Sequence, residues 1–318
     1  MDLNALRLYC DLIETKSFSR AAERSFVTQS AVSQRIHTLE KDYEQPLLER
    51  GRGRRKIVPT EAGQIFYEGA KHLLSEASDL DARLRGLSDD IAGTVRVATV
   101  YSVGLHALPP RLKPFLALHP KVNVHLEYSQ TAKIYQDVLS GAVDIGIVAC
   151  PAPKAGVDIL PFDVETMALI CAPENRFACR ESVSLRELHD QPFIAFADDI
   201  PTRRLIDAQM KAAGAQARIV MSFENIETIK NLVEIGSGVA LVPEETTRKE
   251  AREGTLAVVP LTEKDAFMRP SGLLVKKSGS RRAAVAAFLE AMTDERLDQK
   301  IEQKIENRRQ KAEELAVA

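Results

Sequence analysis

Residues 17–40, SFSRAAERSFVTQSAVSQRIHTLE, decide the fold of the N-terminal part of this chain. The stretch predicts two short helices joined by a tight turn, the first centred on Ala21 and the second directly after it. On the second helix Val32, Ile36 and Leu39 recur at i, i+4 and i+7. This spacing makes one narrow apolar stripe, which predicts that one edge of the helix is buried.

The opposite side of this second helix suits the major groove of DNA. Its side chains can form hydrogen bonds and none of them is acidic, so they can reach base edges without repelling phosphates. The candidate DNA contacts are Thr28, Gln29, Ser30, Ser33, Gln34, Arg35 and His37. Taken alone, the pattern also fits an ordinary amphipathic helix with a solvated polar face.

A short basic segment follows the helix pair. Five of the seven residues from 50 to 56 are Lys or Arg, and two glycines permit a tight turn between short strands. Such a hairpin is a wing, which grips phosphates or places an arginine in the minor groove, although a charge run can also be a solvated loop. Residues 1–60 carry 11 Lys and Arg against 8 Asp and Glu, while the whole chain has a net charge of −2. The candidate phosphate contacts are Arg50, Arg52, Arg54, Arg55 and Lys56.

Three motifs follow one another at fixed spacing: FSRAA at 18–22, QSAVSQRI at 29–36 with Leu39 and Glu40 after it, and PTEAG at 59–63. In this combination the chain resembles the LysR-type transcriptional regulators, which usually carry Phe where Leu48 stands. The resemblance extends to about residue 295. It implies a winged helix-turn-helix, all-α with a small wing, then a long coiled-coil linker helix and an α/β two-lobed effector domain of the periplasmic-binding-protein-like type 2 fold.

The domain boundaries follow from this resemblance and from the change of pattern along the chain. We expect a DNA-binding domain at 1–59, a linker and dimerisation helix at 60–89, and an effector-binding domain at 90–297. Lobe I of that domain is expected at 90–162 and 268–297, and lobe II at 163–267. A charged helical tail at 298–318 departs from the family, and it is either a solvent-exposed extension or an additional subunit contact.

The connector shows a heptad pattern. Apolar or small residues recur with alternating steps of four and three, which is the a/d seam of a coiled coil. The seam residues are Phe66, Ala70, Leu73, Ala77, Leu80, Leu84 and Leu87. Thr60 is the expected N-cap. The pattern predicts a homodimer, or a homotetramer built from it, that places two recognition helices on a two-fold-related operator. The alternative is an amphipathic helix lying on its own domain.

From Gly93 onward, short apolar strands alternate with helices, which predicts βαβ units on a parallel sheet. Strands are expected at 95–100, 122–128, 143–148, 167–170, 193–196, 217–223, 239–242 and 271–275, and helices at 105–118, 131–139, 201–213, 226–235 and 282–292. Crossing strands near 161–165 and 266–270 would join the two lobes around a cleft.

The ends of these strands supply candidate ligand contacts, because small molecules bind there against helix N-termini that favour anions. The resemblance places effector contacts at Ser102, Thr131, Val148 and Thr202, and the helix start adds Pro201 and Arg203. Together they favour a small anionic metabolite as effector. Alternatively, the hydroxyls are helix caps, and Arg203 and Arg204 are solvated or pair with Asp198 and Asp199.

Other classes of protein are disfavoured. The chain lacks a nucleophile elbow, a phosphate loop and a His-Glu-x-x-His motif, so we expect no enzyme and no cofactor. Its four cysteines and six histidines show no metal-ligand spacing, and no export signal or membrane-spanning run is visible, so a cytoplasmic protein with reduced thiols is expected. The remaining alternative is a metabolic enzyme or a solute-binding module of two-lobed α/β fold, fused to a DNA-binding domain.

Overall fold

The computed structural model describes residues 2–49, 57–85, 91–277 and 281–293. The chain divides into two compact units. The first comprises residues 1–94 with the short segments 121–123 and 139–142, and the second comprises the rest. Each unit has a hydrophobic core of its own.

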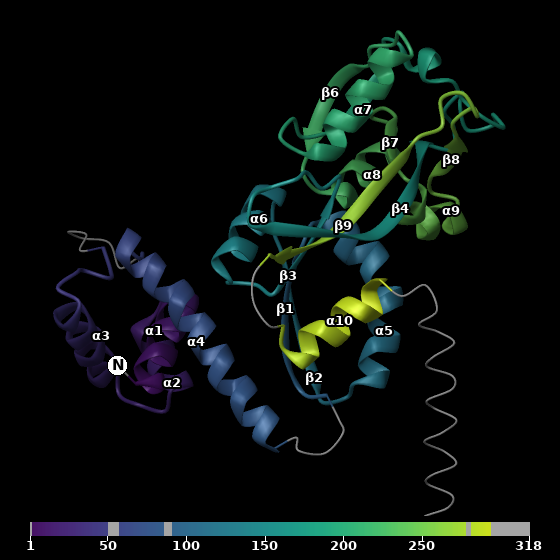
Figure 1. The fold of residues 1–318 in the computed structure, drawn as a ribbon. Coiled ribbons are helices and arrows are strands. Elements are labelled where there is room, and N and C mark those ends of the chain that lie inside the picture. Colours follow the sequence, from purple (N-terminus) through teal and green to yellow (C-terminus); the bar gives the residue numbers. More distant parts are fainter. Residues whose placement is uncertain (1, 50–56, 86–90, 278–280, 294–318) are drawn as a thin grey trace, which may run out of the picture. The chain divides into compact units, whose positions relative to one another are not determined.

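The described residues up to 85 of the first unit contain the helices α1 (Leu3–Thr15), α2 (Phe18–Arg24), α3 (Gln29–Asp42) and α4 (Glu61–Arg85) (Figure 1). The first three helices each begin at a side-chain cap, because Asp2, Ser17 and Thr28 accept hydrogen bonds from first-turn amides. The apolar stripe of α3 is 0–3% exposed and lies in one core cluster with residues of α1. The predicted helix pair and its buried edge are therefore present.

Thr60 caps the long helix α4, because its hydroxyl accepts a hydrogen bond from the first-turn amide of Gly63 at 3.0 Å. The prediction that the heptad seam faces a partner needs correction at its start. The Phe66 ring lies 5.0 Å from the ring of Tyr9, and Ala70 is 2% exposed in a small cluster with α1. These two residues pack inside their own domain because the first turns of α4 cover α1.

Further along α4 the seam is open. Leu73 and Leu80 are 44% and 58% exposed, and Ala77 is half-buried. The side chain of Leu84 and the whole of Leu87 lie outside the described residues. Each of the two alternatives for this helix therefore fits one part of it. The start of α4 packs on its own domain, whereas its later turns present leucines to the surface.

Lobe I of the second unit contains the strands β1 (Gly93–Thr99), β2 (Val122–Tyr128) and β3 (Ile145–Ala149). Its helices are η1 (Val103–Ala107), α5 (Leu108–Leu118), α6 (Thr131–Ser140) and α10 (Ala283–Thr293). The helix expected at 105–118 is in fact a π-helical turn followed by an α-helix. Pro109 and Pro110 explain the change, because they lack N–H groups and fit only the first turn of an α-helix.

Lobe II contains the strands β5 (Pro192–Phe196), β6 (Arg218–Phe223), β7 (Ala240–Pro243) and β8 (Ala257–Pro260). Its helices are η2 (Leu185–Leu188), α7 (Pro201–Ala212), α8 (Ile226–Glu234), η3 (Glu244–Thr247) and α9 (Arg248–Glu253). Strands β5 and β6 pair in parallel, whereas β7 and β8 pair with the crossing strand β4. The core of this lobe is one large apolar cluster between these strands and α7 and α8.

Two strands join the lobes (Figure 1): β4 (Val157–Cys171) and β9 (Met268–Lys276) pair antiparallel over most of their length. The main sheet has the order β2-β1-β3-β9-β4-β7, with β8 paired to β4. Both predicted crossings are present as parts of β4 and β9, and β1 pairs with β3 in parallel as predicted, but the prediction of a parallel sheet is wrong for the sheet as a whole. The expected strand at 167–170 is the end of β4, and the sheet is mixed because the chain crosses to lobe II on one strand and returns on its neighbour.

Candidate DNA-binding surface and effector cavity

The outer face of α3 carries the side chains that the sequence predicts to contact DNA. Exposed on it are Gln29, Ser30, Ser33, Gln34, Arg35 and His37, with Thr28 exposed at the cap. The Gln29 Oε1 atom accepts a hydrogen bond from Ser19 Oγ at 3.2 Å. The buried stripe fixes the helix on its domain, so its polar face is held outward and open to a ligand.

Arg35 differs from the other candidates because it is already paired. Its guanidinium forms an ion pair with the Asp2 carboxylate at the start of α1. The pKa of Asp2 is lowered because its carboxylate accepts a hydrogen bond from the Ala5 amide and lies beside Arg35. The two side chains are 43% and 50% exposed, so water and salt screen the pair and Arg35 remains accessible to a phosphate.

The base of the predicted wing is present. Leu48 and Pro59 form an antiparallel bridge, and the Glu49 amide donates to the Val58 carbonyl at 2.9 Å. The basic tip, with Arg50, Arg52, Arg54, Arg55 and Lys56, lies outside the described residues.

One exposed residue beside α3 is missing from the sequence prediction. Phe26, in the turn between α2 and α3, is 96% exposed and has a left-handed φ of 54°. The sequence signal that could have indicated it is a large apolar residue in the turn of a helix-turn-helix. Its exposure adds an apolar group to this surface.

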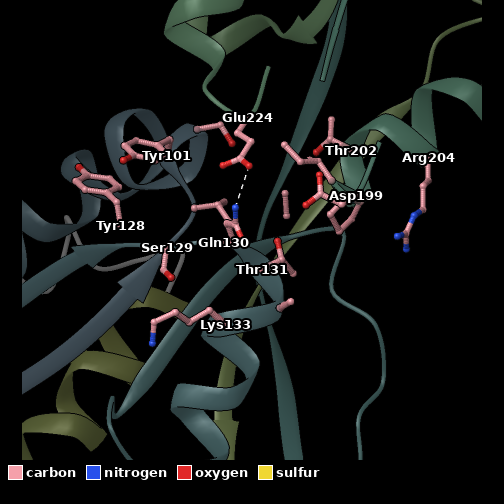
Figure 2. A pocket seen from close by; sticks show the side chains of 16 residues that line it. Tyr101, Tyr128, Ser129, Gln130, Thr131, Lys133, Asp199, Thr202, Arg204 and Glu224 are labelled. Atoms are coloured by element: carbon pink, nitrogen blue, oxygen red, sulfur yellow. Dashed lines mark hydrogen bonds between the residues drawn. The ribbon is translucent and has the colours of Figure 1, made fainter. Parts of the chain in front are cut away.

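A cavity of about 470 Å³ opens between the two lobes of the second unit (Figure 2). It is lined by the last residues of β2 and β3, by the segments that follow β1, β2 and β6, and by the starts of α6 and α7. Four of the six predicted effector contacts line it, namely Ser102, Thr131, Pro201 and Thr202. Its size suits a small metabolite.

Two predicted effector contacts lie elsewhere. Val148 is fully buried in the sheet, and its neighbour Ala149 lines the cavity, because side chains alternate between the two faces of a strand. Arg203 donates to the Asp198 and Asp207 carboxylates at 2.9 and 2.8 Å, and Arg204 lines the cavity. The pairing alternative therefore holds for Arg203, whose partner Asp207 stands one helical turn away.

The rim of the cavity also joins the lobes. Gln130 of lobe I donates from Nε2 to Glu224 Oε1 of lobe II at 2.9 Å, as Figure 2 shows. The rings of Tyr101 and Tyr128 stack in parallel with centroids 5.0 Å apart. The charged lining residues are Lys133 and Arg204 with Asp199 and Glu224, and Lys133 Nζ pairs with Asp137 at 2.7 Å.

A buried ion pair supports Ser102 and Thr202. Arg269 of β9 donates from Nη2 and Nε to Glu165 Oε2 of β4 at 2.7 and 3.0 Å, and the two side chains are 0% and 2% exposed. Burial raises the pKa of Glu165, and the positive charge of Arg269 opposes that shift. The sequence prediction missed this pair, although the charged residues within the apolar crossing strands were a signal.

A second polar connection lies between the lobes. His106 Nε2 of η1 lies 2.8 Å from Glu227 Oε1 of α8. Burial raises the pKa of Glu227, but hydrogen bonds from His106 and Lys230 outweigh it, so the net shift is downward. Lys230 is 2% exposed and also bonds to Glu250 at 2.8 Å. These contacts link the lobes at a place other than the Arg269 pair.

The described ranges hold neither a metal centre nor a membrane span. They contain no group of three or more His, Cys, Asp or Glu that could hold a metal ion, and no helix there is long and apolar enough to cross a bilayer. The cysteines are unpaired thiols. Burial raises the pKa of Cys10 to about 12 and that of Cys171 to about 11, which keeps both protonated.

Two family models match the chain. Residues 3–64 match "Bacterial regulatory helix-turn-helix protein, lysR family", and residues 88–296 match "LysR substrate binding domain". The second match alone covers more than half of the chain. Together they confirm the expected order of a helix-turn-helix domain and an α/β two-lobed domain.

Individual proteins agree with the family matches. A probable RuBisCO transcriptional regulator from Synechocystis sp. is 28% identical over 293 residues, which are 90% of this chain and 84% of the relative. The regulator CysL of Bacillus subtilis is 24% identical over 250 residues, 79% of this chain and 83% of CysL. The crystal structure of CbnR, a LysR family transcriptional regulator, has a TM-score of 0.72 at 21% identity, covering 92% of this chain and 98% of CbnR.

These relatives are transcriptional regulators and not enzymes, in agreement with the expectation from the sequence. The helix-turn-helix match and the exposed polar face of α3 coincide in the first unit, and the substrate-binding match and the cavity coincide in the second. The chain therefore belongs to the LysR family of DNA-binding transcriptional regulators.

Proposed function

We propose that this regulator senses a small anionic metabolite in the cavity between its lobes and binds a two-fold-related operator as a homodimer or homotetramer in the cytoplasm. One observation carries the proposal. The cavity of about 470 Å³ is lined by both lobes, so a ligand in it can favour one arrangement of the lobes over another. A ligand shifts such an equilibrium only by its difference in affinity for the two states.

The chemistry of the lining favours an anion. The first turns of α6 and α7 reach the cavity, and the unpaired amides of a helix start carry a partial positive charge. Arg204 is exposed on the second of these turns, and no hydrogen bond or ion pair to it occurs in the part of the chain that the structure describes. Arg204 can therefore bind a carboxylate without first breaking an internal contact.

The DNA-binding part of the proposal rests on α3 and α4. The neutral outer face of α3 fits base edges in the major groove, and the exposed leucines of α4 supply a surface for a second copy. Full-length CbnR, which has been solved with its target DNA, has a TM-score of 0.71 with this chain at 22% identity, covering 92% of this chain and 99% of CbnR. That complex supports the same mode of binding here.

A thermal-shift screen of the full-length chain tests the proposal. We expect carboxylates or inorganic oxyanions to raise the melting temperature, because a ligand at a hundredfold excess over its Kd adds about 2.7 kcal/mol of stability. Thr202→Ala and Arg204→Ala should each reduce the shift, whereas Arg203→Ala, the neighbouring arginine outside the cavity, should keep it. Hits that are all neutral or cationic, or a silent Arg204→Ala, would contradict the anion site.

A further inference from the structure

The buried pair of Arg269 and Glu165 has a role beyond holding two strands together. The two residues stand opposite each other in the register of β4 and β9. Taking both charges out of water costs several kcal/mol per ion, and well-packed apolar residues often join two strands equally well. Joining the two strands therefore does not account for a buried ion pair at this position, and the other contacts of the guanidinium indicate its role.

The free end of the guanidinium connects the lobes below the cavity. Arg269 Nη1 donates to Ser102 Oγ at 3.1 Å and, in a longer contact, to Thr202 Oγ1 at 3.5 Å. Ser102 follows β1 in lobe I and Thr202 lies in the first turn of α7 in lobe II. Both residues line the cavity, and they are only 8% and 1% exposed. Glu165 holds the other edge of the guanidinium, so the positive end of the pair faces the cavity.

These contacts determine how the two hydroxyls behave. A hydroxyl has one proton and two lone pairs, and an arginine can only donate. Ser102 and Thr202 must therefore accept from Arg269, which leaves their protons for other partners. Within the described ranges Ser102 has no protein acceptor for its proton, and the acceptor beside the Thr202 hydroxyl is the sulfur of Cys150, which accepts only weakly. The two protons can then point into the cavity from opposite lobes.

The geometry points to Arg269 as a specificity-determining positioning residue that turns Ser102 and Thr202 into a pair of hydrogen-bond donors for the oxygens of a carboxylate or an inorganic oxyanion. This inference rests on the proposed function, because it takes the cavity as the effector site. Without Arg269 the same hydroxyls could turn their protons downward and present lone pairs, which a neutral amide or an alcohol would use equally well. Bridging both hydroxyls with one anionic group would also hold lobe I against lobe II.

The experiment compares acetate with acetamide, which has nearly the same shape and no charge, on the full-length chain by ligand-observed NMR titration. The wild type should prefer acetate. Arg269→Met should lower the ratio of acetate to acetamide affinity roughly tenfold, because hydrogen bonds to a charged group are stronger than neutral ones. Arg269→Lys, which also can only donate, should restore most of the preference. Arg269→Met made together with Ser102→Ala and Thr202→Val should lower the ratio no further than those two substitutions alone.

Two further variants keep the test decisive if Arg269→Met does not fold. Ser102→Ala and Thr202→Val leave the ion pair in place, and each should lower acetate affinity more than acetamide affinity. An equal loss for both probes would overturn the donor role. A preserved acetate preference in Arg269→Met, with acetate binding lost in Thr202→Val, would overturn the role of Arg269 and leave the proposed function standing. Acetate binding that is unchanged in Thr202→Val would remove the cavity as the effector site, and both proposals with it.

Discussion

The outer face of α3 and the floor of the proposed effector cavity are the two polar surfaces through which this regulator would meet its ligands, and they are built in opposite ways. The polar side chains on α3 are exposed, and the two partners of the Arg35–Asp2 ion pair are 43% and 50% exposed. The ion pair at the cavity floor is 0% and 2% exposed. Water screens the first pair, whereas the second lies where charges interact strongly and unpaired groups are costly.

The difference matches the size of the two ligands. A DNA duplex is a long polyanion, which many weak contacts can bind, and exposed side chains adjust to it at little cost. A small effector offers only a few atoms, so each contact must be oriented before it arrives. A single substitution at the cavity floor should therefore have a large effect, whereas a single substitution on the DNA face should have a small effect that adds to those of its neighbours.

The largest effect is expected at the buried pair. Glu165→Gln leaves the Arg269 charge buried without a counter-ion, and it should lower the free energy of unfolding by about 3–5 kcal/mol in urea titrations. Arg180→Ala, which breaks an ion pair that is 52% and 38% exposed, serves as the control and should cost no more than about 1 kcal/mol. A similar loss of unfolding free energy in both variants would show that burial of an ion pair does not set its contribution to stability.

The exposed seam of α4 is a third kind of surface, apolar and open. Leu73→Asp combined with Leu80→Asp should raise the dimer dissociation constant of a fragment of residues 1–90 by about a hundredfold or more, because two buried leucines each contribute about 1.5–3 kcal/mol. Sedimentation equilibrium measures it. Ile65→Asp is the matched control, since Ile65 is 67% exposed on the same helix but lies off the heptad. A wild-type fragment that stays monomeric at tens of micromolar would remove the proposed seam.

A smaller effect is expected on the face of α3. Gln29→Ala or Ser33→Ala should reduce discrimination between operator and random duplex by about 1–3 kcal/mol, because each removes a hydrogen bond to a base edge. Fluorescence anisotropy with both duplexes measures the difference. Gln64→Ala, an exposed glutamine on α4, should leave it unchanged. Equal weakening of both duplexes by Gln29→Ala would show that Gln29 does not read bases.

The smallest effect per residue is expected at the wing. Arg52→Ala or Arg54→Ala should weaken operator and random duplex alike and reduce the slope of log K against log salt by about 0.9 for each phosphate that the variant no longer neutralises. Anisotropy titrations over a series of salt concentrations measure the slope. A change confined to the operator would instead assign the wing to sequence reading.

Local patterns in the amino-acid sequence were sufficient for much of this description. The helix pair, the buried stripe at Val32 and Ile36, and most strands and helices of both lobes follow from periodicity and caps. Ser102, Thr131 and Thr202 could be placed at the cavity because strand ends and helix starts are local features and because the family resemblance indicated the same positions. Their prediction required no knowledge of distant contacts.

Other features depended on residues that are far apart in the chain. Arg269 and Glu165 are 104 positions apart, and they meet only because β9 pairs with β4 in one register out of many. Arg204 rather than Arg203 reaches the cavity, and Ala70 is buried against α1 with Phe66 half-buried beside it, because packing sets how each helix is turned about its axis. The sequence by itself determined the elements and the residue types at their ends, whereas the tertiary structure decided which side chains meet, since strand register and helix rotation are set by contacts over the whole fold.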